Sequence, residues 1–412
     1  MPGATYTSTV SSILKEIYQG QIRDQLQSEV IGLKRIEGTN RGVESTVGGK
    51  YVTFPIRVSR NQGIGYRNES EALPSAGNQG YASVRVGLKY GYGRVRITGQ
   101  VMNLAKTNTQ AFANAMDKEM NGLKNDIQKD SARIFYGVPI PSAAGKTGAI
   151  AVGTATGSTT TLVSTTGAGV MYAQVGMDID VYSAGPVTKQ NTETTVITAI
   201  DPATGTITYS PASTAGAGVG GFITRANSYD KEPIGISTIV NDSGALFNVD
   251  PAVQPVWKAV VNHNSGTPRA ISEQMMIKMI DDIRLNGAKT SLILTSLGVR
   301  RSYFMLLTQQ RRYVEMRKFE GGYTGLAFNS GYEVPIVEDV DCPPGNMFFL
   351  DESSLTVYRD EDWHWIDDDG NTLKWVTDYD AFEAVLAKYW EIGVDRRNAN
   401  GVIRDLKSDA IT

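Results

Sequence analysis

The chain has 412 residues, and its 40 Lys and Arg against 43 Asp and Glu give a formal net charge of −3. A protein whose main task is to bind the phosphate backbone of nucleic acid carries a strong basic excess, so the charge balance excludes that class. Hydrophobic residues make up 41% of the chain and charged residues 20%, which is typical of a folded protein with two or three domains.

The first predicted element is a helix over residues 9–36. Apolar residues recur there at helical spacing: Ile13, Ile17, Leu26, Val30 and Leu33. Gly38 follows the end of the pattern. Because the apolar stripe is thin, we expect this helix to pack on another part of the chain or on a neighbouring molecule.

Residues 46–100 favour strands, at 51–58, 84–88 and 94–98, where apolar and polar residues alternate. Between the first two strands, residues 59–82 are polar and carry Pro74. A loop this long is uncommon in a compact domain, so we predict a hairpin arm that leaves the body of the protein. An exposed hairpin is costly to order unless it docks on a partner. Four of its charged residues are the candidates for contacts between identical chains: Arg60, Arg67, Glu69 and Glu71.

The clearest helix is predicted over residues 107–136. One continuous apolar stripe follows it, made of Phe112, Met116, Met120, Leu123, Ile127 and Ile134. Thr107 or Asn108 supplies an N-cap, and Gly137 supplies a C-terminal stop. At 1.5 Å per residue this helix is roughly 45 Å long.

The composition changes between residues 141 and 226. From 141 to 170 the only charged residue is Lys146, and Gly, Ala, Ser and Thr dominate. Short strands follow at 179–182, 194–198 and 206–209, and the last two are joined by a turn at 201–205. The pattern predicts a small β-barrel or sandwich inserted into a larger domain. A flexible low-complexity linker is the alternative.

The remainder is predicted to be mixed α/β. Thr267 and Pro268 are expected to start a helix that ends at Asn286, and a second helix is expected over 297–308. A short buried strand is expected at 291–295. Strands at 333–338 and 346–350 are predicted to pair across the turn at 343–345. Further strands are expected at 355–358 and 382–392.

No catalytic or metal-binding arrangement is visible in the sequence. The single cysteine, Cys342, is best interpreted as a small buried residue. His263 and His364 lie about a hundred residues apart and lack partners at ligand spacing, so neither a metal nor a cofactor is expected. The basic residues Arg300, Arg301, Arg311, Arg312, Arg317 and Lys318 are assigned to a solvated or inter-subunit face. No apolar run approaches the length of a membrane span, and the first residues have no secretory signal. We therefore expect a non-enzymatic protein made and used in a cytoplasm, with no membrane partner.

Two segments carry a resemblance to a known family. In residues 318–345, the strand Glu333-Val-Pro-Ile-Val leads to the turn Asp341-Cys-Pro-Pro-Gly. In residues 388–406, the sequence Lys-Tyr-Trp-Glu-Ile-Gly-Val-Asp-Arg-Arg-Asn closes the chain. With the order of elements, these segments resemble the major capsid proteins of tailed bacteriophages, which have the Hong Kong 97-type fold.

The resemblance implies an α+β fold and a division of the chain. Its parts are an N-terminal arm (1–45), an extended loop (46–103), a peripheral domain with a spine helix (104–140), an inserted β-domain (141–226), a continuation of the peripheral domain (227–262), an axial domain (263–371) and a return to the peripheral domain with the C-terminal tail (372–412).

The resemblance also implies a function. The chain would assemble with itself into hexamers and pentamers of an icosahedral shell that encloses double-stranded DNA without sequence-specific binding. It would form in the host cytoplasm and end in the virion. A portal, a decoration protein and a separate scaffolding protein are the other expected partners, the last because the arm begins close to Met1. An encapsulin-type shell around protein cargo is the main alternative. A secreted β-rich adhesin and an unrecognised enzyme are more remote.

Overall fold

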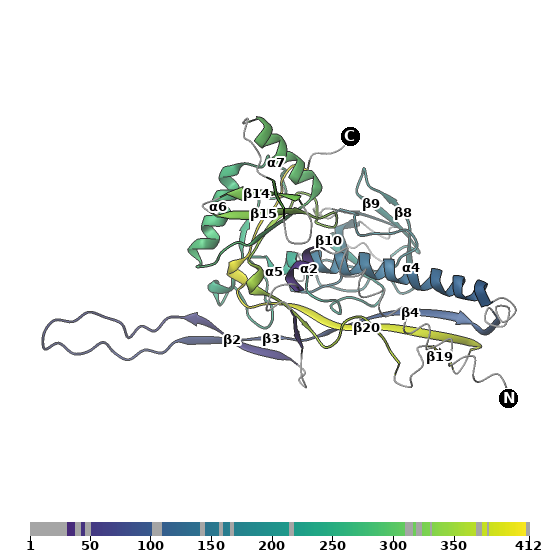
Figure 1. The fold of residues 1–412 in the computed structure, drawn as a ribbon, viewed down its shortest axis with the longest axis horizontal. Helices are drawn as coiled ribbons and strands as arrows, with labels where there is room; N and C mark the ends of the chain where they lie inside the picture. The colour runs from purple at the N-terminus through teal and green to yellow at the C-terminus, as the bar shows by residue number, and fades with distance from the viewer. Residues whose placement is uncertain are drawn as a thin grey trace.

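The structure is a computed structural model that describes residues 31–37, 43–45, 51–100, 109–140, 145–155, 160–164, 169–213, 218–309, 316–318, 324–329, 332–367, 373–376 and 379–408. The predicted N-terminal helix appears as α2 (Ile31–Glu37), and the rest of that prediction lies outside the described residues. The fold is α+β, as predicted, with two large sheets, a closed barrel and a two-stranded ribbon (Figure 1).

A long strand and a long helix form the spine. β20 (Ala381–Val394) pairs antiparallel with β4 (Lys89–Thr98), from Ala381 opposite Thr98 to Trp390 opposite Lys89. The same sheet holds β1 (Val43–Ser45), β17 (Leu355–Arg359), β18 (His364–Trp365) and β19 (Lys374–Trp375). Helix α4 (Thr109–Tyr136) lies along β4, as Figure 1 shows, and is about 42 Å long. Met120 and Ile127 of the helix pack on Val95 and Ile97 of the strand.

A second sheet has seven strands in the order β11-β21-β16-β12-β15-β14-β13. Their bounds are β11 (Val260–Asn262), β12 (Leu292–Thr295), β13 (Met316–Lys318), β14 (Thr324–Asn329), β15 (Glu333–Glu338), β16 (Met347–Leu350) and β21 (Gly401–Ile403). One face of this sheet packs on α6 (Glu273–Leu285) and α7 (Leu297–Gln309), through Ile293 and Phe349 of the strands. The other face, through Leu294 and Phe348, joins the main core.

Two predictions in this region are wrong. β15 and β16 do not pair with each other, because β12 lies between them, parallel to β15 and antiparallel to β16. Every residue of β12 is buried, so the strand takes the central place that excludes the most water.

Helix α6 begins at Glu273 instead of following Thr267. Its N-cap is Ser272, whose Oγ accepts a hydrogen bond from the Met275 amide at 3.3 Å. The residues before it are held extended, because the Arg269 amide donates to the Asp405 carbonyl at 2.7 Å.

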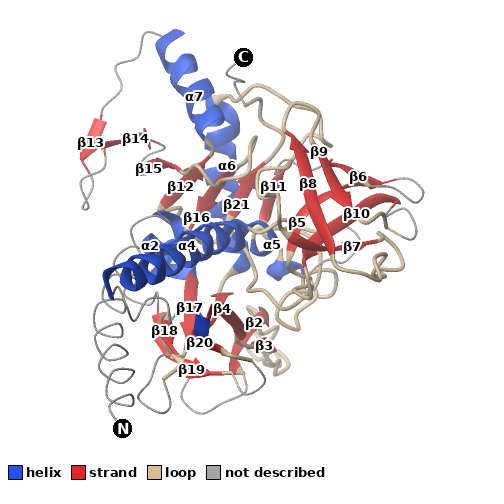
Figure 2. Cartoon of the chain, turned by 90° about the vertical axis from the view of Figure 1, so that its right-hand side faces the viewer, coloured by secondary structure: helices blue, strands red, loops and turns tan. Residues whose placement is uncertain are grey.

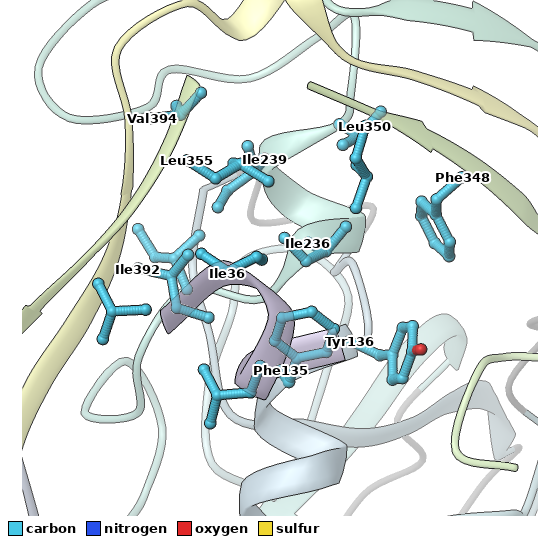
Figure 3. Close-up of a cluster of buried hydrophobic side chains, with 14 of the residues drawn as sticks. Ile36, Phe135, Tyr136, Ile236, Ile239, Phe348, Leu350, Leu355, Ile392 and Val394 are labelled. Carbon is cyan, nitrogen blue, oxygen red and sulfur yellow. The ribbon is translucent and has the colours of Figure 1, made fainter. Parts of the chain in front are cut away.

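The main core joins elements that are distant in sequence (Figure 3). Side chains from α2, the end of α4, α5 (Ile236–Ile239), β16, β17 and β20 meet there, including Ile36, Phe135, Ile236, Leu350, Leu355 and Ile392. Gly32 permits α2 to lie against α4, since a Cβ atom at that position would be 2.4 Å from Phe135 Cε1. Ion pairs then fix the other side of α2, with Arg35 Nε 2.9 Å from Glu352 Oε1 and Lys388 Nζ 3.7 Å from Glu37 Oε1.

The closing segment of the chain stabilises this core from the C-terminal side. Within η3 (Arg397–Ala399), the buried Arg397 guanidinium donates to four backbone carbonyls, those of Thr238, Ile239, Ser243 and Gly244, at 2.8 to 3.2 Å. Burial lowers the pKa of Arg397 to about 10, which leaves the side chain charged at neutral pH. The segment that follows α5 is therefore held by one side chain from the end of the chain.

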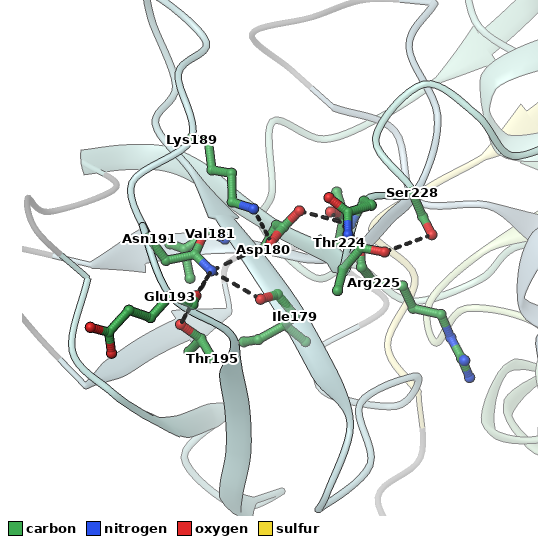
Figure 4. A network of polar contacts seen from close by, with 12 residues as sticks. Ile179, Asp180, Val181, Lys189, Asn191, Glu193, Thr195, Thr224, Arg225 and Ser228 are labelled. Carbon is green, nitrogen blue, oxygen red and sulfur yellow. Dashed lines mark hydrogen bonds and ion pairs between the residues drawn. The ribbon is translucent and has the colours of Figure 1, made fainter. Parts of the chain in front are cut away.

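Between α4 and α5 the chain forms a closed barrel in the order β10-β5-β6-β9-β8-β7 (Figure 2). Its strands are β5 (Ala149–Ala155), β6 (Thr161–Ser164), β7 (Asp178–Tyr182), β8 (Thr195–Asp201), β9 (Thr206–Ser210) and β10 (Gly218–Arg225). The strands enclose a core in which Ile150, Leu162 and Phe222 are fully buried and to which Val138 and Ile140, between α4 and β5, also belong. The buried Asp180 carboxylate contacts Lys189 Nζ at 2.7 Å and accepts from the Asn227 amide at 2.8 Å (Figure 4).

The two ends of the barrel segment lie side by side. The Asp230 amide donates to the Thr147 carbonyl at 3.0 Å, and Thr147 Oγ1 donates to the Glu232 carbonyl at 2.7 Å. Away from this junction, the Tyr172 hydroxyl donates to the Asp341 carbonyl at 2.7 Å, and Arg225 Nε lies 3.0 Å from Asp130 Oδ2. Only a short connection is needed to bridge the ends.

We predict that the body folds without the barrel. Replacing residues 149–225 with a short Gly/Ser linker keeps the hydrogen bonds between Thr147 and residues 230–232, and loop closure depends only weakly on length. Scanning calorimetry should show one cooperative transition, with the loss of the Tyr172 and Arg225 contacts lowering Tm by several degrees. A broad, non-cooperative transition would show that the barrel is part of the main core.

Candidate functional site

The predicted arm is the most prominent feature outside the body. Strands β2 (Val52–Ser59) and β3 (Gly80–Val86) form a separate two-stranded ribbon. Its root is anchored, because Val84 and Val86 are buried in the main core and Phe54 and Ile56 pack against it. Beyond Ser59 and Gly80 the chain continues as a loop that projects to the left, far from the rest of the molecule, in Figure 1.

The tip of the arm is closed by its own hydrogen bonds. Arg67 Nε donates to the Ala72 carbonyl at 2.9 Å, and Glu71 accepts from the Asn68 amide at 3.0 Å. Hydrogen bonds from the Asn68 amide and side chain hold the pKa of Glu71 below its ordinary value. Two of the four predicted contact residues, Arg67 and Glu71, therefore shape the tip turn around Ser70, whose φ is 69°.

The other two predicted residues, Arg60 and Glu69, are exposed, and neither forms a hydrogen bond or ion pair within the described part of the chain. The structure does not bring Arg60 and Glu69 together. Their role in contacts between chains stays a prediction.

Three large apolar side chains on the arm were missed by the sequence analysis. Ile64, Tyr66 and Leu73 are 76%, 99% and 86% exposed. Ile64 and Tyr66 are separated by Gly65, and Leu73 lies between Ala72 and Pro74, so no periodic pattern reveals them. A search for apolar residues that lie in a predicted arm, where no other element is expected to bury them, would have identified them.

A second exposed surface lies on the spine sheet, on the face opposite α4. The residues of β4 alternate, so Tyr90, Tyr92, Arg94 and Arg96 point outward while Val95 and Ile97 pack on the helix side. Tyr389 of β20 stands between the two tyrosines, with ring centroids 5.0 Å from Tyr90 and 5.9 Å from Tyr92.

These five residues, Tyr90, Tyr92, Arg94, Arg96 and Tyr389, are called the spine strip below. From Tyr90 to Arg96 the strip runs about 20 Å along the strand. Arg94 and Arg96 both lie near Glu383, at 3.6 and 3.8 Å. The hydrogen bond between the Tyr92 and Tyr389 hydroxyls, together with partial burial, raises the pKa of Tyr389 to about 12. At neutral pH the strip is therefore aromatic at one end and cationic at the other.

A buried carboxyl lies where the arm returns to the body. Lys89 Nζ donates to the Asp230 carbonyl at 2.6 Å, which ties the start of β4 to the segment after the barrel. Beside it, the buried Glu391 carboxyl accepts from the amides of Ile234 at 2.6 Å and Ile392 at 3.0 Å. Removal from water outweighs these bonds and the nearby Lys89 charge, so the pKa of Glu391 rises to about 8.

Other residues singled out in the sequence have structural surroundings. Cys342 is buried, as predicted, and burial raises the pKa of its thiol well above the ordinary value. The Tyr136 hydroxyl donates to Asp339 Oδ2 at 2.7 Å beside it. His364 lies in the two-residue strand β18, with Nδ1 3.5 Å from Glu361 Oε2.

Of the predicted basic group, Arg300 forms an ion pair with Glu338. Residues 311 and 312 lie outside the described residues. Across the described ranges, no three His, Cys, Asp or Glu side chains are grouped as a metal site. None of the helices described here is both long enough and apolar enough to span a membrane.

Comparison with known proteins identifies the fold. No protein-family model and no curated protein sequence matches the chain. Among solved structures, the capsid of cyanophage A-1(L) matches with a TM-score of 0.53 and 15% identity over 92% of this chain and 93% of that one.

Two further solved structures are less similar. A solved structure of Mycobacterium phage Patience matches at TM-score 0.45 and 9% identity over 97% and 89% of the two chains. The SrpI encapsulin of Synechococcus elongatus matches at 0.43 and 7% over 92% and 89%. The cyanophage match shows that this chain shares the fold of that phage capsid structure, in agreement with the capsid fold expected from its sequence.

We predict that Glu391 makes stability fall as pH rises. Below pH 4.5 the carboxyl is protonated in both states, whereas between pH 4.5 and about 8 only the unfolded chain ionises, which favours unfolding. Glu391→Gln, whose amide oxygen can accept the same two amide hydrogen bonds, should remove this loss. Denaturant unfolding from pH 5 to 9 should show the variant gaining relative to wild type, by on the order of 4 kcal/mol at the alkaline end. Parallel pH profiles for the two proteins would refute the assignment.

Proposed function

We propose that this chain is the major capsid protein of a tailed double-stranded DNA bacteriophage. The observation that carries the proposal is an arm anchored in the core at its root while Ile64, Tyr66 and Leu73 at its far end touch almost nothing. Exposed apolar groups held away from the body are unfavourable in a monomer and favourable once a partner covers them. The capsid fold supports the same reading.

The partner of the arm is a second copy of the chain, and the receiving surface is its spine strip. The apolar side chains of the arm match the tyrosines of the strip, and the unpaired Glu69 matches its cationic end at Arg94. Because arm and strip are different surfaces, each copy gives one contact and receives one. Contacts of this head-to-tail kind form rings when the rotation between successive copies closes.

The remaining parts of the proposal follow the expected division of the chain. Residues 1–45 act as an N-terminal arm, 46–103 as the extended loop, 141–226 as an inserted domain and 263–371 as the axial domain of the capsomer. The shell encloses DNA without reading its sequence, in keeping with a net charge of −3. Assembly takes place in the host cytoplasm with a separate scaffolding protein, a portal and a decoration protein. The chain has a structural and not an enzymatic role.

The test of the proposed function is assembly. The purified chain, alone and co-expressed with the neighbouring structural genes, should form closed particles by light scattering and electron microscopy. Shells from an infection should hold nuclease-protected DNA, whereas an encapsulin-type shell would hold protein. Monomers under every condition would refute the proposal.

We predict that the arm acts in assembly and not in folding. Replacing Gly65–Gly77 with a tight turn removes the tip and leaves the buried root intact, so Tm of the subunit should stay within a few degrees. Shell formation, followed by light scattering, should be lost or reduced at least tenfold.

Point substitutions distinguish the loss of the tip's apolar contacts from the loss of the tip's shape. Ile64→Ser with Tyr66→Ser and Leu73→Ser keeps the hydrogen bonds of the tip, which run through Arg67, Asn68 and Glu71, and should also slow assembly. The matched control is Val175→Ser with Val253→Ser, two apolar side chains exposed to 64% and 70% elsewhere on the molecule, which should assemble normally. Normal shells from the arm variants would place the contact elsewhere.

A further inference from the structure

Helices α6 and α7 cover the same face of the seven-stranded sheet but lie over different parts of it. Helix α6 contacts β11 and β21, at one end of the strand order. Helix α7 follows β12, and its Tyr303 ring lies 6.4 Å from Phe328 of β14, toward the other end. Their buried sides share one core that contains Met279, Ile283 and Val299. Each helix also has an outer side that this core does not use.

The two outer sides carry the same spacing. On α6, Ile277, Asp281 and Leu285 follow one another at steps of four, and Ile277 and Leu285 are 40% and 85% exposed. On α7, Leu297, Arg301 and Met305 follow at the same steps, and Leu297 and Met305 are 39% and 54% exposed. Residues four apart lie on one side of a helix, so each set forms a continuous stripe about 12 Å long.

The stripes are complementary in charge as well as in length. Each has apolar side chains at its ends and a charge at its centre, acidic on α6 and basic on α7. Asp281 is exposed and has no hydrogen bond or ion pair among the described residues. Arg301 is half-exposed, and the five N–H donors of a guanidinium can serve more than one acceptor. The adjacent Phe304, 51% exposed, widens the apolar part of the α7 stripe.

We propose that α6 of one copy packs on α7 of the next copy, with Asp281 opposite Arg301. The charged residue lies midway between the apolar ends of each stripe, so the ends coincide whether the helices run parallel or antiparallel. The contact deepens the proposed function and rests on it, since it assigns a second surface between capsid subunits, distinct from the arm and the spine strip.

The proposed contact is head-to-tail. In a two-fold contact both stripes of each copy would face both stripes of one partner, whereas stripes that lie over different parts of the sheet can each face a different copy. A copy that offers α7 to its neighbour still has α6 free for another copy. Repetition of such a contact gives a ring, the arrangement that a capsomer requires, when the rotation from one copy to the next closes.

Reversal of charge tests the contact. Asp281→Arg and Arg301→Asp each place like charges together and should slow capsomer formation at least tenfold, as followed by light scattering and native mass spectrometry. The double variant carries the pair in the opposite order and should recover most of the wild-type rate. Glu193→Arg, at an exposed acid on the barrel, is the matched control and should behave as wild type. Tm of each unassembled subunit shows that folding is preserved.

A cysteine pair tests the same contact independently of charge. In a Cys342→Ser background, Ile277→Cys with Met305→Cys places the two thiols opposite each other if the helices run antiparallel, and Ile277→Cys with Leu297→Cys does so if they run parallel. Mild oxidation should give a ladder of covalent multimers from one of these two double variants and none from any single variant.

The two proposals fail in different ways. Normal assembly of both charge-reversal variants, or no recovery in their double variant, overturns the helix contact while the shell function stands. If the wild-type chain never assembles, the proposed function fails and this contact fails with it.

Discussion

The antiparallel pairing of β20 with β4 is the constraint on which the rest of the structure depends. β20 is 14 residues long and also pairs with β17, β18 and β19, so it joins segments from opposite ends of the chain. One face of the β4–β20 pair packs on α4, which leaves the other face as the spine strip. The same register places the buried Glu391 beside Lys89, at the point where the arm rejoins the body. The arm, helix and strip thus take their positions from a single ladder.

The energetics of the arm differ along its length. Its root contributes apolar side chains such as Val84 and Val86 to the main core, and their burial stabilises the subunit. Its tip contributes nothing to the core, and Tyr66 is almost completely exposed. The tip keeps its shape through the local hydrogen bonds of Arg67 and Glu71. The tip therefore loses less conformational entropy when a partner binds. A hydrogen-bonded tip with uncovered apolar side chains fits a contact between chains better than a contact within one chain.

Prediction from sequence succeeded where the signal is local and periodic, and failed where pairing is decided over distance. The apolar stripe of the spine helix led to α4, and alternation led to β4 and β20. The turn at residues 343–345 suggested that β15 and β16 pair, yet β12, from about forty residues earlier, lies between them because it is apolar on both faces. Likewise, threonine is a residue type favoured at helix N-caps, but the C-terminal segment holds the residues after Thr267 extended. Neither the insertion of β12 nor the contact made by the C-terminal segment can be recognised in the local sequence.

For the candidate site, the sequence by itself determined that an arm exists, because residues 59–82 are too polar and too numerous to fold into a core. It also determined the inventory of charges on that arm. Only the structure decided which of them are available, since Arg67 and Glu71 form hydrogen bonds within their own turn while Ile64, Tyr66 and Leu73 are left uncovered. The tertiary structure also determined that the spine strip and the stripes on α6 and α7 are exposed. Exposure depends on what packs against a side chain, and packing joins residues that the sequence holds hundreds of positions apart.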